Sequence, residues 1–280
     1  MSKDRQNAKT RSDKAAVDPV RPIAPYIGGK RNLAGRIVPM IDADPHTRYC
    51  EVFTGMGGIF FRRTRRPAAE FINDWSRDVA TLFRILQRHY PQFLEILRFT
   101  LTTRTEFERL VATDADTLTD LERAARFLYL QRTSFAGKVV GQTFGVSKDR
   151  PARFNLTTVE PMLEDVHSRL SGVTIERLDF EEFIRRYDSS ETFFYLDPPY
   201  WGVEGYYGKE LFGRDDFQRL KDVLSTVKGR FLLSINDTPE VRDIFKGFDM
   251  QAVGVKYSAS TAGRRNIERR ELLIGAVPTG

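Results

Sequence analysis

The 280-residue sequence predicts an α/β fold. One indication is an apolar strand, residues 48–53, that passes through a glycine-rich turn into a helix expected to begin near Ile59. Another is the alternation of strand and helix patterns that resumes at residue 157. A third is the apolar run 193–196, which ends in Asp-Pro-Pro-Tyr and is typical of a buried strand followed by a stiff loop. Ligands of open α/β sheets bind at the carboxyl ends of such strands.

The composition limits the class of protein. A hydrophobic content of 41% indicates a globular chain, and the net charge of +6 is compatible with a polyanionic partner without requiring one. The single cysteine, Cys50, excludes an internal disulfide and fits a reducing compartment, so we expect a cytoplasmic protein. Three scattered histidines give no metal-ligand spacing, and no apolar run reaches the ~20 residues of a membrane span. We therefore expect neither a metal site nor a membrane-spanning segment.

The N-terminal region contains a tail and a glycine turn. Residues 1–20 are polar and without periodicity, which predicts a disordered basic tail. We expect this tail to be solvated, although it could also attract phosphate groups. In Tyr-Ile-Gly-Gly-Lys, residues 26–30, the glycines allow close approach of a ligand, and an amphipathic helix follows. Lys30, near the positive end of that helix, suits a carboxylate or phosphate. Alone, the segment favours a plain turn with an exposed lysine.

The next elements form the first half of a nucleotide-type site. The turn over residues 54–58 is rich in glycine but lacks the full dinucleotide pattern, so it is a weak signal, and no Gly-Lys-Ser/Thr follows it. A strand over 69–72 leads to Asp74, about 20 residues past that turn, where an acid commonly holds ribose hydroxyls. The alternative role for Asp74 is to cap the following helix.

Residues 88–131 change character, because helical patterns follow one another there without a strand. Residues 130–150 are then basic, rich in Gly, Ser and Thr, and interleaved with aromatic side chains. Such a hairpin or loop suits contacts with nucleic acid, although an ordinary solvated loop is the alternative. A second basic loop follows at 263–266, between two strands, 253–257 and 271–274, that we expect to pair antiparallel. The DNA-contact candidates are Arg132, Ser134, Lys138, Gln142, Lys148, Arg264 and Arg265.

The loop after residue 196 suits methylation of an exocyclic amine on a planar ring. Asp197 can accept one N–H of the amine and the Pro198 carbonyl the other, which turns the nitrogen lone pair toward a methyl donor. Tyr200 can stack on the base, a contact worth about 1–3 kcal/mol. Neither Pro198 nor Pro199 has an N–H that would compete. The alternative is a Pro-Pro turn that merely ends a strand.

Five blocks of residues occur in one order, and together they carry a family resemblance. The blocks are 26–30, 51–58, 73–74, 127–137 and 197–200. With them, residues 22–277 resemble the Dam-like family of DNA adenine-N(6) methyltransferases. Tyr26 stands where that family usually has tryptophan, and Gln131 where it usually has asparagine. Ala136 stands where the G-A-T-C-specific members of the family have another asparagine. We therefore do not predict G-A-T-C as the target.

The resemblance implies a Rossmann-like, seven-stranded methyltransferase sheet with a helical target-recognition domain inserted after the second strand. S-adenosylmethionine would be the methyl donor and double-stranded DNA the substrate, with the target adenine flipped out of the duplex. Lys30 and the 53–57 loop would hold the methionine end of the donor, Asp74 its ribose, and Asp179 with Phe180 its adenine. The cofactor residues implied in this way are Tyr26, Gly29, Lys30, Glu51, Phe53, Gly55, Gly57, Asp74, Asp179, Phe180 and Asp197, and the target-base residues are Asp197, Pro198, Pro199 and Tyr200.

The change of pattern at residue 88 and the return of strand and helix alternation at residue 157 set the expected domain limits. The catalytic domain would comprise residues 21–87 and 157–280, and the helical and hairpin insert residues 88–156. Transfer would be direct, without a covalent intermediate, in a protein expected to be monomeric. Two rivals stay open: the same fold acting on cytosine-N(4), RNA or a glutamine amide, and a DNA-binding regulator or decoy that no longer catalyses. An acid at position 197 favours adenine, since serine or asparagine is usual in enzymes with the other acceptors.

Overall fold

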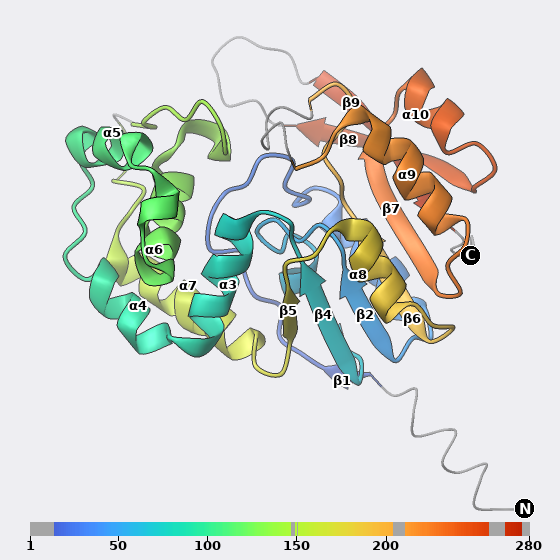
Figure 1. The fold of residues 1–280 in the computed structure, drawn as a ribbon, viewed down its shortest axis with the longest axis horizontal. Coiled ribbons are helices and arrows are strands. Elements are labelled where there is room, and N and C mark those ends of the chain that lie inside the picture. The colour runs from blue at the N-terminus through green and yellow to red at the C-terminus, as the bar shows by residue number, and fades with distance from the viewer. Residues whose placement is uncertain (1–13, 147–148, 150, 204–210, 258–266, 276–280) are drawn as a thin grey trace, which may run out of the picture.

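The computed structural model describes residues 14–146, 149, 151–203, 211–257 and 267–275, and a seven-stranded sheet lies at its centre (Figure 1). In spatial order the strands are β5 (Thr174–Glu176), β4 (Ala69–Asn73), β2 (Arg48–Glu51), β6 (Thr192–Leu196), β7 (Arg230–Asn236), β9 (Ile267–Gly275) and β8 (Met250–Tyr257). Pairing is parallel from β5 through β7, while β9 is antiparallel to both β7 and β8. The predicted α/β fold and the predicted antiparallel pair near the C-terminus are confirmed.

The strand order reverses beside β2. From β2 the chain proceeds outward to β4 and β5, and it then returns to place β6 on the other side of β2. At such a point the loops after two neighbouring strands diverge, which opens a crevice at the carboxyl ends of the strands. Glu51 ends β2 and Asp197 directly follows β6, so both residues border this crevice.

Strand β6 is buried along its whole length, which explains its continuous apolar sequence. Its side chains alternate between two hydrophobic clusters, as the period of a strand requires. Phe193 and Tyr195 pack with residues of the first cluster, which includes Leu82 and Leu128, whereas Phe194 packs into the second. The strand is therefore held on both faces, and the loop that follows it starts from a fixed point.

Helices cover the sheet in two groups. Figure 1 shows α3 to α7 gathered to one side of the sheet, and α8 and α9 in front of it. The predicted helical character of the segment after β4 is confirmed, and α6 begins with a capping box formed by Thr119 and Glu122. The helices are α2 (Ala34–Ala43), α3 (Arg77–Arg88), α4 (Tyr90–Leu97), α5 (Arg104–Ala112), α6 (Asp120–Thr133), α7 (Leu156–Arg169), α8 (Phe180–Tyr187), α9 (Arg214–Leu224) and α10 (Pro239–Ile244).

The helix expected to begin near Ile59 is absent from the structure. Only a 3₁₀ turn, Phe60–Arg62, follows the glycine-rich loop, and the short strand β3 (Arg65–Arg66) comes directly after it. The buried Arg63 donates to Glu70 and to the carbonyl of Arg65, and Pro67 cannot continue a helix. These contacts pull the chain into an extended path that a helix could not follow.

Part of the predicted tail is folded. Residues 1–13 lie outside the described residues, but β1 (Ala15–Ala16) pairs antiparallel with β3. The ammonium of Lys14 donates to the carbonyl of Asp42 at 3.0 Å, and the amide of Val20 donates to the carbonyl of Phe61 at 2.6 Å. The prediction of a tail through residue 20 is wrong for residues 14–20, because this stretch is mostly apolar, unlike residues 1–13, and its backbone pairs with the rest of the fold.

Candidate active site

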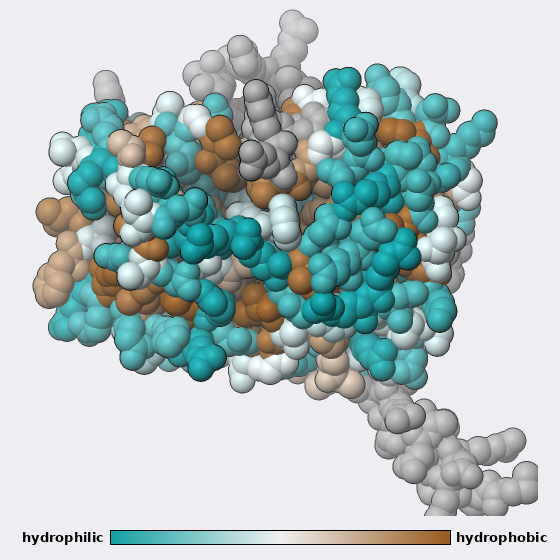
Figure 2. Space-filling view, viewed as in Figure 1, coloured by the Kyte–Doolittle hydropathy of each residue, from teal (hydrophilic) through white to brown (hydrophobic). Residues whose placement is uncertain are grey.

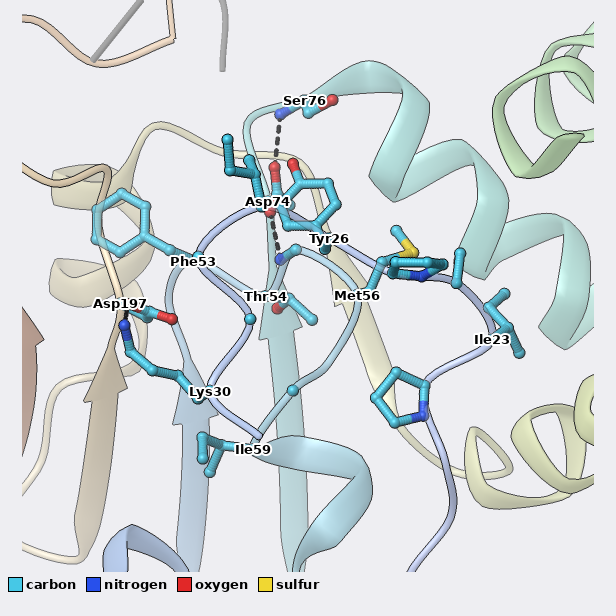
Figure 3. A pocket seen from close by; sticks show the side chains of 18 of the residues that line it. Ile23, Tyr26, Lys30, Phe53, Thr54, Met56, Ile59, Asp74, Ser76 and Asp197 are labelled. Atoms are coloured by element: carbon cyan, nitrogen blue, oxygen red, sulfur yellow. Dashed lines mark hydrogen bonds and ion pairs between the residues drawn. The ribbon is translucent and has the colours of Figure 1, made fainter. Parts of the chain in front are cut away.

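A cavity of about 1240 Å³ lies at the carboxyl end of the parallel strands, in the crevice between the ends of β2 and β6 (Figure 3). It exceeds the roughly 300–1,000 Å³ usual for one small molecule. One wall belongs to the sheet and its loops, and the other includes Arg132, Phe135 and Met162 from the helical segment and the loop after it. The sheet side is lined by residues 21–31, 53–56, 73–76 and 178–180, with Asp197 and Pro199.

The loop after β6 brings a carboxylate to the edge of this cavity. The side chain of Asp197 is 20% exposed, and its Oδ1 lies 2.7 Å from the ammonium of Lys30. The next residues are fixed by Asn236 at the end of β7, which accepts from the Trp201 amide at 2.9 Å and donates to the Trp201 carbonyl at 3.0 Å. Burial raises the pKa of Asp197 to about 6, although Lys30 acts in the opposite direction. The carboxylate is thus held in place and is ionised at neutral pH.

Lys30 connects the loop after β6 with strand β9. Its side chain is only 2% exposed, and its ammonium also lies 3.5 Å from Oε2 of Glu271 on β9. It donates to the hydroxyl of Tyr200 and lies 4.3 Å from the centroid of that ring. Figure 3 shows Lys30 and Asp197 pointing toward one another. The lysine is therefore buried beside the Asp-Pro-Pro-Tyr loop, and the alternative of an exposed turn lysine is wrong.

Hydrogen bonds to Asp74 hold the glycine-rich turn at the end of β4. One oxygen of the Asp74 carboxylate accepts from the Gly55 amide at 2.8 Å and the other from the Ser76 amide at 2.9 Å (Figure 3). Ser76, not Asp74, is the N-cap residue of α3. Burial raises the pKa of Asp74 to about 6, and the two amide donors counteract this. A carboxylate held in this way keeps lone pairs that can accept from a ligand.

Gly55 shows why glycine is needed in this turn. Its φ of +50° is a left-handed conformation, and a Cβ there would come within 2.9 Å of the Tyr26 ring. At Gly57 a Cβ would come within 2.3 Å of the Phe61 ring. Gly57 is the one predicted cofactor residue that is not among the cavity-lining residues, and its glycine is required for packing.

Asp179 and Phe180 line the cavity where the chain enters α8. Asp179 caps α8 by accepting from the Glu181 amide at 3.0 Å, and it also accepts from Arg219. Phe180 is 5% exposed, and its ring centroid lies 5.8 Å from that of Phe53 and 5.7 Å from that of Phe212. The predicted pair thus lines the cavity, with Asp179 half-exposed and Phe180 inside an aromatic cluster.

Glu51 differs from an ordinary carboxylate. It is 1% exposed, its Oε2 accepts from the hydroxyl of Tyr49 at 2.6 Å, and it borders the cavity. Burial raises its pKa to about 8, so it is mainly protonated at neutral pH. A protonated acid can donate one hydrogen bond as well as accept others.

The structure corrects one of the predicted DNA contacts, Ser134, and shows how Arg132 is held. Arg132 is half-buried and donates to the carbonyls of Ile23 and Arg153, while burial lowers its pKa. Ser134 is fully buried and forms an isolated antiparallel bridge with Phe144. Both residues hold the loop after α6 against the rest of the fold; Ser134 is too deeply buried to contact DNA, whereas Arg132 lines the cavity.

The other DNA-contact candidates fall into two groups. Lys138 is exposed, and the half-buried Gln142 donates to Gln131 at 3.2 Å and to the Lys138 carbonyl at 3.0 Å. Lys148, Arg264 and Arg265 lie outside the described residues.

Two residues of the site were missed by sequence reasoning. Glu271 was noted only as part of a strand, although a charged residue directly before Leu272-Leu273-Ile274 is a signal that could have identified it. Phe212 gave no comparable signal, because its position against Phe180 depends on the path of the chain before α9.

The described residues contain no group of three or more His, Cys, Asp or Glu side chains arranged to hold a metal ion. Within the same residues, none of the helices has the length and apolar character needed to cross a membrane.

The sheet order, the glycine-rich turn after β2 and the Asp-Pro-Pro-Tyr loop after β6 define a Rossmann-like methyltransferase. Residues 26–259 match the family described as D12 class N6 adenine-specific DNA methyltransferase. The chain therefore belongs to this family of DNA-modifying enzymes, which confirms the predicted family and class of activity.

Similar proteins carry related names. Type II methyltransferase M.CviBI of Paramecium bursaria Chlorella virus NC1A is 24% identical over 82% of this chain and 88% of its own length. Type II methyltransferase M1.LlaDCHI of Lactococcus lactis subsp. cremoris is 26% identical over 84% of this chain and 87% of its own length. DNA adenine methylase of Haemophilus influenzae is 25% identical over 90% of this chain and 92% of its own length.

The raised pKa of Glu51 predicts a pH-dependent stability. An acid whose pKa rises from 4.5 to about 8 on folding stabilises the folded state fully below pH 4.5, and this contribution is lost as the pH rises toward 8. Glu51→Gln, which stays neutral, should weaken the decline of the free energy of unfolding over this range. Urea titrations at several pH values measure this, with the exposed Glu108→Gln as the matched control. Parallel pH profiles for wild type and Glu51→Gln would contradict the prediction.

Proposed function

We propose that the chain transfers a methyl group from S-adenosylmethionine to the exocyclic N(6) of a flipped adenine in double-stranded DNA. The observation that carries this proposal is the position of Asp197, which borders the 1240 Å³ cavity directly beside Lys30 and the loops around Gly29 and Gly55. A base-holding acid and the predicted cofactor residues thereby share one space. Direct transfer needs this arrangement, because the reacting atoms must be brought close together and aligned.

The target base would be held by the loop after β6. In this proposal Asp197 and the Pro198 carbonyl accept the two N–H groups of the adenine amine, Pro199 keeps the loop stiff, and the ring of Tyr200 stacks on the base. The ionised state of Asp197 above about pH 6 suits an acceptor. The base must leave the duplex to reach this loop, as in other enzymes that act on bases.

No covalent intermediate with the enzyme is involved in the proposed reaction. Cys50 is buried among Val52 and Phe194, and burial raises the pKa of its thiol far above neutrality. The nucleophile is the adenine nitrogen itself, and its surplus proton can leave after the methyl group has been transferred.

The charged and aromatic side chains that line the cavity support S-adenosylmethionine as its ligand. Lys30 would attract the carboxylate of its methionine end, Asp74 would accept from its ribose hydroxyls, and Phe180 with Phe53 would lie along its adenine. When bound, the cofactor supplies an electrophilic methyl group on a sulfonium. Asp74 supports this assignment, since two backbone amides already orient its carboxylate toward the cavity.

The DNA would meet the rim formed by the segment after α6. Exposed Lys138 supplies charge for a phosphate, while Phe135 and Val146 are exposed and line the cavity. Figure 2 shows one face of the molecule on which polar and apolar side chains are mixed. We assign residues 88–156 to target recognition, and we propose a monomer that acts on DNA in the cytoplasm.

Asp197→Ala should abolish methyl transfer while S-adenosylmethionine still binds. Removal of a group that orients the reacting amine is expected to lower kcat by about 10²- to 10³-fold or more. Transfer of labelled methyl groups to DNA gives the rate, and calorimetry gives cofactor affinity. Asp215→Ala, which removes an exposed acid on α9, is the control. Full activity of Asp197→Ala would refute the role of this acid.

Lys30→Ala should weaken cofactor binding by about tenfold or more, because a buried cation is lost opposite the methionine carboxylate. Calorimetric titration with S-adenosylmethionine measures the change, and Lys138→Ala should leave that affinity unaltered. An unchanged cofactor affinity in Lys30→Ala would remove Lys30 from the cofactor site.

Lys138→Ala should reduce the salt dependence of DNA binding. Loss of one phosphate contact lowers the slope of log K against log salt concentration by about one. Fluorescence anisotropy with a labelled duplex measures this slope, with Lys246→Ala on the short turn after α10 as the control. If the slope of Lys138→Ala matched that of wild type, the segment after α6 would not be a DNA contact at this residue.

A further inference from the structure

Glu271 is a buried acid whose contacts lead into the active site. It lies on β9 opposite Asn236 of β7, is 1% exposed, and precedes the apolar residues Leu272–Ile274. Its Oε2 lies 3.5 Å from the ammonium of Lys30. Because burial of an uncompensated carboxylate is costly, this contact gives the acid a compensating charge.

The ammonium of Lys30 therefore lies near two carboxylates, those of Asp197 and Glu271. Lys30 lies closer to Asp197, at 2.7 Å, than to Glu271, at 3.5 Å, and its side chain is almost fully enclosed. In the proposed reaction, however, Asp197 must accept an N–H of the target amine. While the ammonium is bound to Oδ1 of Asp197, it uses one acceptor site of the carboxylate and offsets its charge, so Asp197 is a weaker acceptor for that amine.

We propose that Glu271 is a positioning residue for methyl transfer, which retains the ammonium of Lys30 when Asp197 takes the amine of the target base. This inference rests on the proposed function, in which Asp197 holds adenine and Lys30 faces the cofactor. A second carboxylate within reach lets the enclosed cation loosen its contact with Asp197 without losing its counter-charge. In the absence of this second acid, the undivided ion pair with Lys30 keeps Asp197 the weaker acceptor.

The charges around Asp197 give this role a signature in the pH dependence. Lys30 lowers the pKa of Asp197 and Glu271 raises it, while burial gives the largest contribution, toward a value of about 6. Removal of the charge on Glu271 leaves the effect of Lys30 less opposed, so the pKa of Asp197 should fall. Among the residues that the structure describes, other polar or titratable groups near Asp197 include Glu51 of β2, Tyr195 of β6, Ser234 of β7 and Tyr200.

The test is Glu271→Gln, which preserves the shape of the side chain and removes its charge. We expect kcat for methyl transfer to DNA to fall about tenfold, an effect of the size shown by neighbouring coupled groups. The acid limb of its pH profile should move to lower pH, and calorimetry should give an unchanged affinity for S-adenosylmethionine. Carbon-13 NMR of the cofactor-free protein, labelled in aspartate carboxyls and assigned with Asp197→Asn, should show the same downward shift in the pKa of Asp197.

Two further variants separate positioning from simple structural support. Glu271→Asp retains the charge and should give an intermediate kcat with the acid limb of wild type. Glu240→Gln makes the same change at an exposed acid of α10 and should leave every measurement as in wild type. If Glu271→Gln did not fold, a loss of kcat alone in Glu271→Asp would support the proposal, and a loss of both kcat and cofactor affinity, or of neither, would overturn it.

The remaining outcomes distinguish this inference from the proposed function. If wild-type protein transferred no methyl group to adenine, the proposed function would be wrong and this inference with it. If wild type were active and Glu271→Gln kept its rate and pH profile, only the role of Glu271 would be wrong. An equal loss of kcat and cofactor affinity in Glu271→Gln would mark Glu271 as structural support and overturn its positioning role.

Discussion

The enclosed ammonium of Lys30 is the interaction on which the site depends. It joins three segments that are distant in the sequence, namely the glycine turn before α2, the loop after β6 and strand β9. A cation that is 2% exposed requires opposite charge nearby, and the two carboxylates require the cation in turn. The three segments therefore stabilise one another, and the carboxyl edge of the sheet is closed around a charged centre.

A second set of contacts fixes the cavity from the side of the helical segment. Gln131 of α6 donates to the carbonyls of Pro25 and Gly137 at 3.3 Å each, and the amide of Ile27 donates to Gly137 at 3.2 Å. A Cβ on Gly137 would come within 2.8 Å of the Pro25 backbone, so the two loops pack directly together. The segment that we assign to target recognition thus supports the loop that we assign to the cofactor. A base bound against the target-recognition segment and a cofactor bound against the loop around Gly29 would therefore be held by loops that contact each other.

Much of this arrangement could be predicted from the sequence. The buried strand β6 followed from a continuous apolar run, and the loop after it from two prolines that permit little else. The glycine turns and Asp74 followed from their spacing, and the predicted cofactor residues, except Gly57, do line one cavity. These features are local, because each depends on the residue type and its immediate neighbours.

The features that could not be predicted depend on tertiary contacts. Whether Arg132 and Ser134 face outward is decided by the packing of the α6 end against loops that come from elsewhere in the chain. The missing helix after Ile59 reflects the buried ion pair of Arg63 with Glu70, and Glu70 is held in turn by Arg169 of α7, which is distant in the sequence. The role of Glu271 appears only when β9 is placed beside β7.

The N-terminal strap, residues 14–20, has a practical consequence. Its backbone supplies a pairing partner for β3, and Lys14 binds the carbonyls that end α2, so this stretch closes the lower edge of the domain. A chain trimmed at residue 20 would expose that edge and leave those carbonyls without their cation. For deletion or fusion, the boundary of the folded unit thus lies ahead of Lys14, well before the first helix.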